Sequence, residues 1–171
     1  MRTAIMIGML VCLSVISASA QSWTFKRDSV EYLIDLPSSA WRVVPRVDVH
    51  EHVDFVNGND EANGYLRLSK ILVEVGTTAT NLFQDDEKWN LQHLPGYVVC
   101  GNCNGEAFRG HLSGTTFSYE YSNHGRTMSG RVYYLQIDKR TFYTLRFTVA
   151  QGKLQGMREE MDSIARSFRL K

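Results

Sequence analysis

The feature that most constrains the fold is a run of short alternating segments between residues 97 and 149, separated by turn signals. Apolar or aromatic residues recur at every second position, as in Phe117, Tyr119 and Tyr121, which is typical of strands. Gly, Asn, Asp and Ser residues occupy the short connections, as expected of hairpins. The predicted strands are Tyr97–Cys100, Cys103–Gly110, Gly114–Tyr121, Met128–Ile137 and Thr141–Val149. Hairpin-connected strands pair antiparallel, so this part of the chain predicts an antiparallel meander.

The segments on either side of the meander complete the predicted order of elements. Residues 23–26, 30–35, 41–56 and 65–75 carry strand patterns, and Thr80–His93 is predicted to be a helix that ends before Pro95 and Gly96. A stripe of apolar residues at helical spacing predicts a C-terminal helix that packs against the sheet: Leu154, Met157, Met161, Ile164, Ala165 and Phe168. Because strands and helices do not alternate one by one, the predicted fold class is α+β, with a mainly antiparallel sheet flanked by helices.

Two motifs near the ends of the domain resemble those of PsbP-like domains. Tyr32–Pro37, followed by Trp41, is similar to the strand, proline and tryptophan that begin these domains. Arg140–Leu145, followed by a helix that ends in Ser167-Phe168-Arg169, is similar to their closing pattern. The resemblance covers nearly the whole chain after its first twenty residues and implies an α/β/α sandwich around an antiparallel sheet.

The same resemblance implies a class of function and no site residue. PsbP-like domains include the extrinsic lumenal protein of photosystem II, a nuclear-import factor that binds a small GTPase, and many exported bacterial proteins. These members generally act as binding or assembly modules. No partner-binding surface is matched residue by residue, and the Cys pair described below is not part of the family pattern.

The first twenty residues, Met1–Ala20, have the pattern of an export signal. Arg2 supplies the positive end, Ala4–Ile16 the apolar run, and Ala18-Ser19-Ala20 a small-residue cleavage site. The apolar run is shorter than the roughly 20 residues that span a bilayer. Cleavage would leave residues 21–171 as a single globular domain, exported to the periplasm or secreted, without a transmembrane segment.

The charge balance argues against a nucleic-acid partner. The chain has 19 Lys and Arg and 18 Asp and Glu, so the loss of Arg2 leaves a formal charge of zero. Nucleic-acid binding proteins neutralise phosphates with clustered basic residues, and no such run occurs here. The partner of the predicted module, whether a protein or a small molecule, is therefore unknown but is not a nucleic acid.

The sharpest local motif is Cys100-Gly101-Asn102-Cys103, for which three interpretations compete. Gly-Asn is a two-residue hairpin turn, and an oxidising compartment would join the flanking thiols in a structural disulfide. A thiol–disulfide enzyme would need the first Cys at a helix N-terminus, but Asn104-Gly105 favours another turn. A zinc site would need two further ligands, and no second Cys pair exists. We predict a disulfide between Cys100 and Cys103, with the redox role as the alternative.

His50 and His52 form the second candidate site. Their spacing on the strand predicted over 41–56 places both imidazoles on one face together with Asp48 and Asp54, while Val53 and Phe55 face the other way. Such a row could bind zinc or copper, as in a periplasmic metal-binding protein. It is equally typical of the solvated face of a strand, which we favour because metal sites usually draw ligands from several elements.

No constellation of residues indicates catalysis or a cofactor. The Gly-x-Ser-x-Gly motif of nucleophilic hydrolases does not occur, and no glycine-rich loop has the spacing that cradles phosphates. Most of the aromatic residues in the meander are expected in the core: Phe117, Tyr119, Tyr121, Tyr133, Tyr134, Phe142 and Tyr143. The sequence therefore predicts an exported, non-catalytic binding or assembly module without a cofactor.

Overall fold

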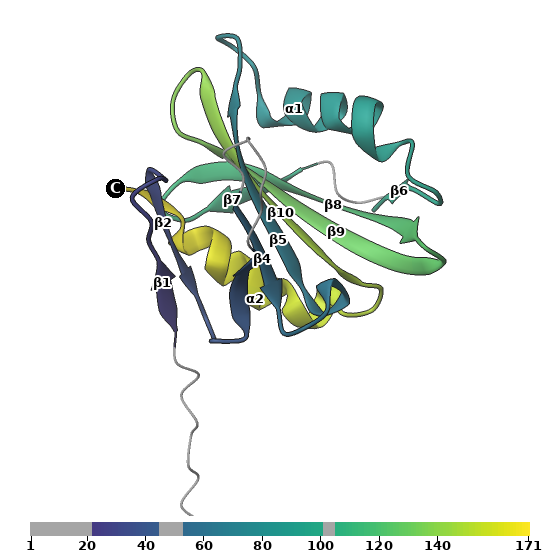
Figure 1. Cartoon of the computed structure of the whole chain (residues 1–171). Coiled ribbons are helices and arrows are strands. Elements are labelled where there is room, and N and C mark those ends of the chain that lie inside the picture. The colour runs from purple at the N-terminus through teal and green to yellow at the C-terminus, as the bar shows by residue number, and fades with distance from the viewer. Residues whose placement is uncertain (1–21, 45–52, 101–104) are drawn as a thin grey trace, which may run out of the picture.

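Two antiparallel sheets and two helical segments make up the described part of the computed structural model, which covers residues 22–44, 53–100 and 105–171 (Figure 1). In chain order the elements are β1 (Trp23–Phe25), β2 (Tyr32–Leu36), β3 (Trp41–Val44), β4 (Val53–Asn57), the 3-10 turn η1 (Glu61–Asn63), β5 (Tyr65–Leu72), α1 (Ala79–Asp86), the π-helical η2 (Glu87–Leu91), β6 (Val98–Val99), β7 (Glu106–Arg109), β8 (Ser113–Asn123), β9 (Arg126–Gln136), β10 (Thr141–Ala150), α2 (Leu154–Ser167) and β11 (Arg169–Leu170).

The large sheet has the strand order β3-β4-β5-β10-β9-β8-β6, and β7 pairs with a further part of β8. Every pairing in it is antiparallel. The predicted hairpins that join β8 to β9 and β9 to β10 are present, and the predicted α+β class with a mainly antiparallel sheet is confirmed. β6 and β7 were predicted to form a hairpin with each other, but both pair with β8 instead. The long strands β8, β9 and β10 form the centre of the large sheet, because hairpins connect them directly and alternation continues along their whole length.

Helices cover opposite faces of the large sheet (Figure 1). On one face, α2 buries Met161, Ile164 and Ala165 against inward residues such as Leu145 and Phe147 of β10. On the other face, α1 and η2 cover a smaller core. Successive residues of β10 face the two cores in turn, because side chains along a strand alternate with a period of two residues. The sheet is therefore buried on both sides.

The attachment of α1 depends on one aromatic pair and one cap. The ring of Phe83 stacks on Phe117 of β8 with centroids 4.1 Å apart. At the start of the helix, Thr78 Oγ1 accepts a hydrogen bond from the Asn81 N–H at 3.2 Å, and Asn81 Oδ1 accepts one from the Thr78 N–H at 3.0 Å. This reciprocal cap satisfies amides that the first turn leaves unpaired, so the helix begins at Ala79.

A buried arginine ties α2 to the sheet. Arg131 of β9 has a side chain that is 5% exposed and lies 3.3 Å from carboxylate oxygens of both Glu106 and Asp162. It also donates from Nε to the Tyr133 hydroxyl at 2.8 Å, and Tyr133 in turn donates to Asp162. Because each of these polar groups has a partner, the network holds α2 in register with β9.

The small sheet joins the two motifs that resemble PsbP-like domains. β2 lies between β1 and β11, so the first and last strands of the domain lie in the same sheet. Asp35 of β2 accepts from Arg169 Nη1 at 2.9 Å, and its backbone N–H donates to Ser167 Oγ at 2.8 Å. Phe168 lies fully buried beneath this sheet, between Tyr32 and Tyr143. The two motifs therefore form one structural unit.

Two other predicted elements also differ from the structure. The strand predicted over residues 41–56 is two strands, β3 and β4, which pair antiparallel with each other. Alternation is unchanged by a reversal of chain direction, so the pattern alone did not reveal that β3 and β4 run in opposite directions. The predicted helix over Thr80–His93 is present, but its second half is the π-helical η2. Among the described residues, no helix has the length and apolar character needed to cross a membrane.

Candidate functional site

Two arginines stand directly opposite one another on the face of the sheet that carries α1. Arg67 of β5 and Arg146 of β10 are register partners in the antiparallel pair. Like charges directly opposite on a sheet are destabilising, so such a pair persists only where other groups compensate it. The compensating groups come from different elements for the two side chains.

Arg67 is held by Asp54 of β4, its register partner on the other side. Arg67 Nε donates to Asp54 Oδ1 at 3.1 Å, Nη2 donates to Oδ2 at 3.4 Å, and the Tyr65 hydroxyl donates to Oδ2 at 2.5 Å. The carboxylate is completely buried, whereas the Arg67 side chain is 36% exposed. Burial alone would lower the pKa of Arg67, but the hydrogen bonds to Asp54 and Tyr65 raise it above its usual value. The Arg67 guanidinium therefore stays charged and faces outward.

Arg146 is held by the helical layer above it. Its Nη2 donates to Asp86 Oδ2 at the last residue of α1, and its Nη1 donates to the Tyr119 hydroxyl at 3.3 Å. Asp86 also accepts from the Asn90 side-chain amide at 2.9 Å and from the Tyr134 hydroxyl at 3.4 Å. Burial opposes the charge of Arg146, but Tyr119 and Asp86 raise the pKa of the guanidinium above its usual value. The ion pair thus joins α1 to the centre of the sheet.

The change from α- to π-helical geometry occurs at this ion pair. η2 begins directly after Asp86, buries Leu91, and leaves the Trp89 side chain 66% exposed. Short π-helical turns inside helices occur frequently at functional sites. Here Asp86, directly before the turn, accepts from Arg146 of the sheet, and Asn90 within the turn donates to the same carboxylate.

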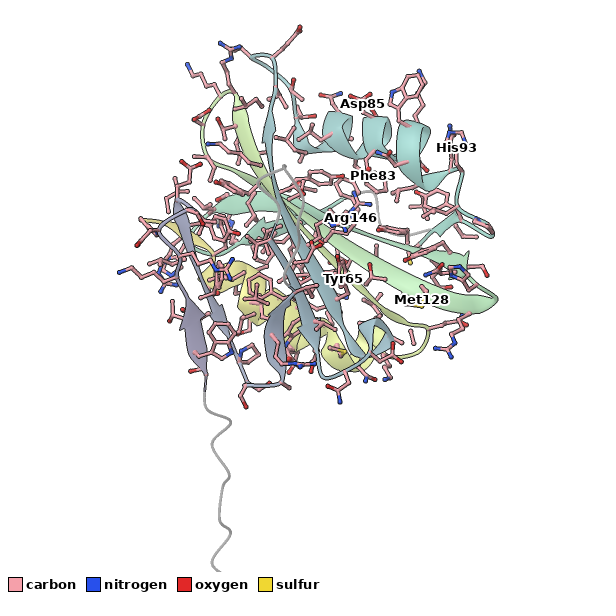
Figure 2. All side chains as sticks on the ribbon, viewed as in Figure 1. Tyr65, Phe83, Asp85, His93, Met128 and Arg146 are labelled. Atoms are coloured by element: carbon pink, nitrogen blue, oxygen red, sulfur yellow. The ribbon has the colours of Figure 1, made fainter. Side chains whose placement is uncertain are left out.

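Beneath this helical layer lies a cavity of about 220 Å³, which we call the arginine cavity. Figure 2 labels Tyr65, Met128 and Arg146, three of its lining residues, below α1. The full lining is Tyr65, Arg67, Leu91, Leu94, Tyr119, Tyr121, Asn123, Met128, Arg146 and Thr148. A neighbouring cavity of about 630 Å³ shares Arg67 and Arg146 and extends past Asp85, Asp86 and Trp89. The two cavities adjoin at Arg67 and Arg146, and we call the two together the groove between the sheet and the α1–η2 segment.

The groove has the chemistry of a binding site. Its lining residues include no His or Cys. Burial raises the pKa values of Tyr65 and Tyr119, so these phenols remain protonated at neutral pH and act as hydrogen-bond groups. Guanidinium groups stay protonated near pH 7. The arginine cavity therefore offers fixed charge, hydroxyl groups and apolar surface, and neither its phenols nor its guanidinium groups are poised to act as a general base.

The two predicted sites fall partly or wholly outside the described residues. Cys100 follows β6, where its backbone N–H donates to the Ser118 carbonyl at 3.2 Å, but Cys103 lies outside the described residues, so the disulfide remains a prediction. His50 and His52 also lie outside them, so the metal site remains a prediction. Elsewhere, in the part of the chain that the structure describes, no group of three His, Cys, Asp or Glu side chains is placed to hold a metal ion.

The structure corrects one part of the interpretation of residues 41–56. Val53 and Phe55 do face the core beneath α2, as predicted. Asp54, predicted on a solvated face, is instead buried against Tyr65 and Arg67. The reason is that this face of β4 adjoins β5, whose outward residues are large enough to cover a short carboxylate.

Sequence reasoning also missed the two arginines. Their signal was present as a cationic residue directly between two apolar ones: Arg67 lies between Leu66 and Leu68, and Arg146 lies between Leu145 and Phe147. The prediction that most aromatic residues of the meander lie in the core is confirmed for six of them, which are all buried: Phe117, Tyr119, Tyr133, Tyr134, Phe142 and Tyr143. Tyr121 is the exception, being half-buried at the edge of the arginine cavity.

Solved structures share this fold at low sequence identity. The solution structure of cyanobacterial PsbP (CyanoP) from Synechocystis sp. PCC 6803 has a TM-score of 0.61 at 14% identity, covering 96% of this chain and 99% of that one. LpqN, involved in cell envelope biogenesis of Mycobacterium tuberculosis, has a TM-score of 0.58 at 17% identity, covering 88% and 91%. A mutant of the protein Mog1 has a TM-score of 0.62 at 7% identity, covering 88% and 96%.

These similarities define the class of the fold. The chain has a PsbP-like α+β fold, as the two terminal motifs predicted. No protein-family model matches the sequence, and no curated protein is detectably similar to it. At these identities the likeness concerns the fold alone.

Proposed function

We propose that this protein is an exported, non-catalytic binding module whose ligand or partner occupies the groove between the α1–η2 segment and the sheet. The observation that carries the proposal is the direct opposition of Arg67 and Arg146 at the floor of that groove. An arrangement that costs stability in the sheet is expected at a functional site, where local rules of folding are broken for another purpose.

Support for a binding role, as opposed to catalysis, comes from the groups that line the groove. The arginines are held charged, and the tyrosines Tyr65 and Tyr119 are held protonated, because the pKa of each of these groups is raised. Groups that transfer protons in catalysis usually have pKa values near the working pH. The exposed indole of Trp89 at the rim adds a side chain that is enriched where proteins bind partners.

Support for export comes from Met1–Ala20 and from the description of LpqN as involved in cell envelope biogenesis. The test is to express the full chain in its native cell and to determine the N-terminal residue of the purified protein. We expect Gln21 at the N-terminus of protein recovered from outside the cytoplasm. Protein that retains Met1 and fractionates with the cytoplasm would contradict export.

The groove itself is tested by site-specific photo-crosslinking in the native cell. A photoreactive phenylalanine analogue replaces Trp89 at the rim, and the matched control replaces Glu159, which is exposed on α2 on the opposite side of the sheet. We expect an adduct at position 89 and none at position 159, detected by intact mass and by gel. Equal adducts at both positions, or none at position 89, would argue against the groove as the binding surface.

A further inference from the structure

The geometry points to a small amphipathic anion as the ligand of the arginine cavity: a carboxylate or phosphate group on a short apolar body. This inference rests on the proposed binding function and adds the chemical class of the ligand. It follows from three properties of the cavity, namely its charge, its hydrogen-bond donors and its apolar wall.

The charge facing the cavity is positive. Both arginines line it, whereas neither Asp54 nor Asp86 does, and its lining includes no acidic residue. The two carboxylates hold the arginines from other sides, through β4 and through the end of α1. An anion between Arg67 and Arg146 would separate two like charges that are otherwise directly opposite, so its binding would relieve their repulsion.

The two arginines of the cavity also have N–H donors that make no hydrogen bond to the described residues. The contacts of Arg67 within the described residues use Nε and Nη2, and those of Arg146 use Nη1 and Nη2. Nη1 of Arg67 and Nε of Arg146 are thus left for a ligand. The amide of Asn123 and the hydroxyl of Thr148 line the same space. Guanidinium donors suit the oxygens of carboxylates and phosphates, since these groups accept several hydrogen bonds at once.

The remaining wall is apolar. Leu91 and Leu94 enter from the helical layer and Met128 enters from β9. A bare inorganic ion would leave this surface against water, whereas a short hydrocarbon or aromatic ring would cover it. The volume of about 220 Å³ is below the range of roughly 300–1,000 Å³ typical of sites for drug-sized ligands, which limits the body to a few carbon atoms or one ring.

The test is a titration of the purified domain, monitored by amide NMR shifts and calorimetry, with benzoate, hexanoate and phenyl phosphate as anionic probes. Benzamide and hexanol serve as uncharged counterparts of the same shape, and inorganic phosphate serves as the anion without an apolar body. We expect the amphipathic anions to bind with dissociation constants between about 10 µM and 1 mM, and the uncharged counterparts to bind at least about tenfold more weakly. The carboxylate and phosphate arms separate the two sources of negative charge.

Variants then assign the binding to the cavity. Arg67→Lys keeps the positive charge but loses the planar guanidinium that can donate two hydrogen bonds to one anion. We expect this variant to weaken binding about tenfold. Asn123→Ala changes an exposed lining residue without touching the core, and we expect it to weaken binding about threefold. The matched control is Arg109→Gln on β7, outside the lining, which should leave the affinity unchanged.

Three outcomes would overturn the inference. The first is equal affinity for charged and uncharged probes, the second is equal affinity for inorganic and phenyl phosphate, and the third is no binding by any probe at about 10 mM. If crosslinking at Trp89 still captures a ligand or partner in any of these cases, the groove remains a binding site and only the ligand class is wrong. If crosslinking at residue 89 also fails, the proposed function of the groove as a binding site is contradicted as well.

Discussion

Gly130 of β9 lies directly opposite Tyr119 of β8, and the Tyr119 ring fills the space in which a side chain at residue 130 would stand. A Cβ placed on Gly130 would lie 2.3 Å from Tyr119 Cζ. The absence of a side chain at this one position lets the tyrosine ring lie flat across the sheet, with its hydroxyl within reach of Arg146. The floor of the arginine cavity therefore depends on a glycine.

The first prediction concerns this contact. Gly130→Ala should lower the free energy of unfolding by about 1–3 kcal/mol, because the buried Tyr119 ring has to move. Gly156→Ala in α2 is the matched control: a Cβ at this residue would have no atom within 4 Å, so the substitution should raise the free energy of unfolding by about 0.4–1 kcal/mol. Urea denaturation followed by circular dichroism measures both changes. Effects of the same sign would contradict the close approach at Gly130.

The second prediction concerns the tie between α1 and the sheet. Asp86→Asn should lower the free energy of unfolding by about 1–3 kcal/mol, because Arg146 would keep its charge and lose its carboxylate partner. Asp85→Asn changes the exposed neighbour by the same chemistry and should stay within about 0.5 kcal/mol of the unsubstituted protein. The same denaturation measurement applies. Equal losses in the two variants would show that the ion pair contributes nothing specific.

The third prediction concerns acid stability. The hydrogen bonds from Arg169, followed by that from Thr24, hold the pKa of Asp35 below its usual value of 3.8. The folded carboxylate thus binds protons less tightly than the unfolded one, so its contribution to stability is complete above pH 3.8 and is lost as the pH falls through the folded pKa. Asp35→Asn should therefore be destabilising at pH 7, with a difference from the unsubstituted protein that shrinks in strong acid.

The partner of Asp35 provides the control for this pH dependence. Arg169→Gln removes the other half of the pair and should show the same profile, with a loss at neutral pH that diminishes at low pH. Free energies of unfolding measured in urea across the acid range test both variants. A loss that is constant at every pH would mean that the ion pair is not the source of the effect.

The fourth prediction concerns Cys100 and Cys103. If the exported protein carries the disulfide, alkylation without reduction should leave its mass unchanged, and alkylation after reduction should add two alkyl groups. Because the closed loop is very short, reduction should lower the free energy of unfolding by about 2 kcal/mol or less. Two alkyl groups added without reduction would show free thiols and would contradict the structural disulfide.

Much of the fold could be predicted from local pattern. The strands predicted over Met128–Ile137 and Thr141–Val149 differ by only a few residues from β9 and β10, because alternation and turn residues are properties of adjacent positions. The apolar stripe of α2 was equally readable, since its residues recur within a single helix.

The candidate site could not be predicted in the same way, because it depends on which strands become neighbours. β5 pairs with β10 although the α1–η2 segment and four strands separate them in the chain. Arg67 and Arg146 become opposite residues only through that pairing, and Asp54 becomes buried only because β4 lies on the other side of β5. Alternation determines the face on which a side chain lies, but strand order decides what stands beside it.

The pairing of β2 with β11 also constrains the order in which the two sheets fold. β2 lies near the beginning of the domain and β11 near residue 170, so one edge of β2 has no partner until residues 169 and 170 pair with it. The large sheet can form earlier from its hairpins, because their contacts are local, whereas the small sheet joins the most distant residues of the domain. A folding intermediate in which β11 has not yet paired would therefore leave Tyr32 and Leu33, the register partners of β11, at an open strand edge that chaperones could recognise.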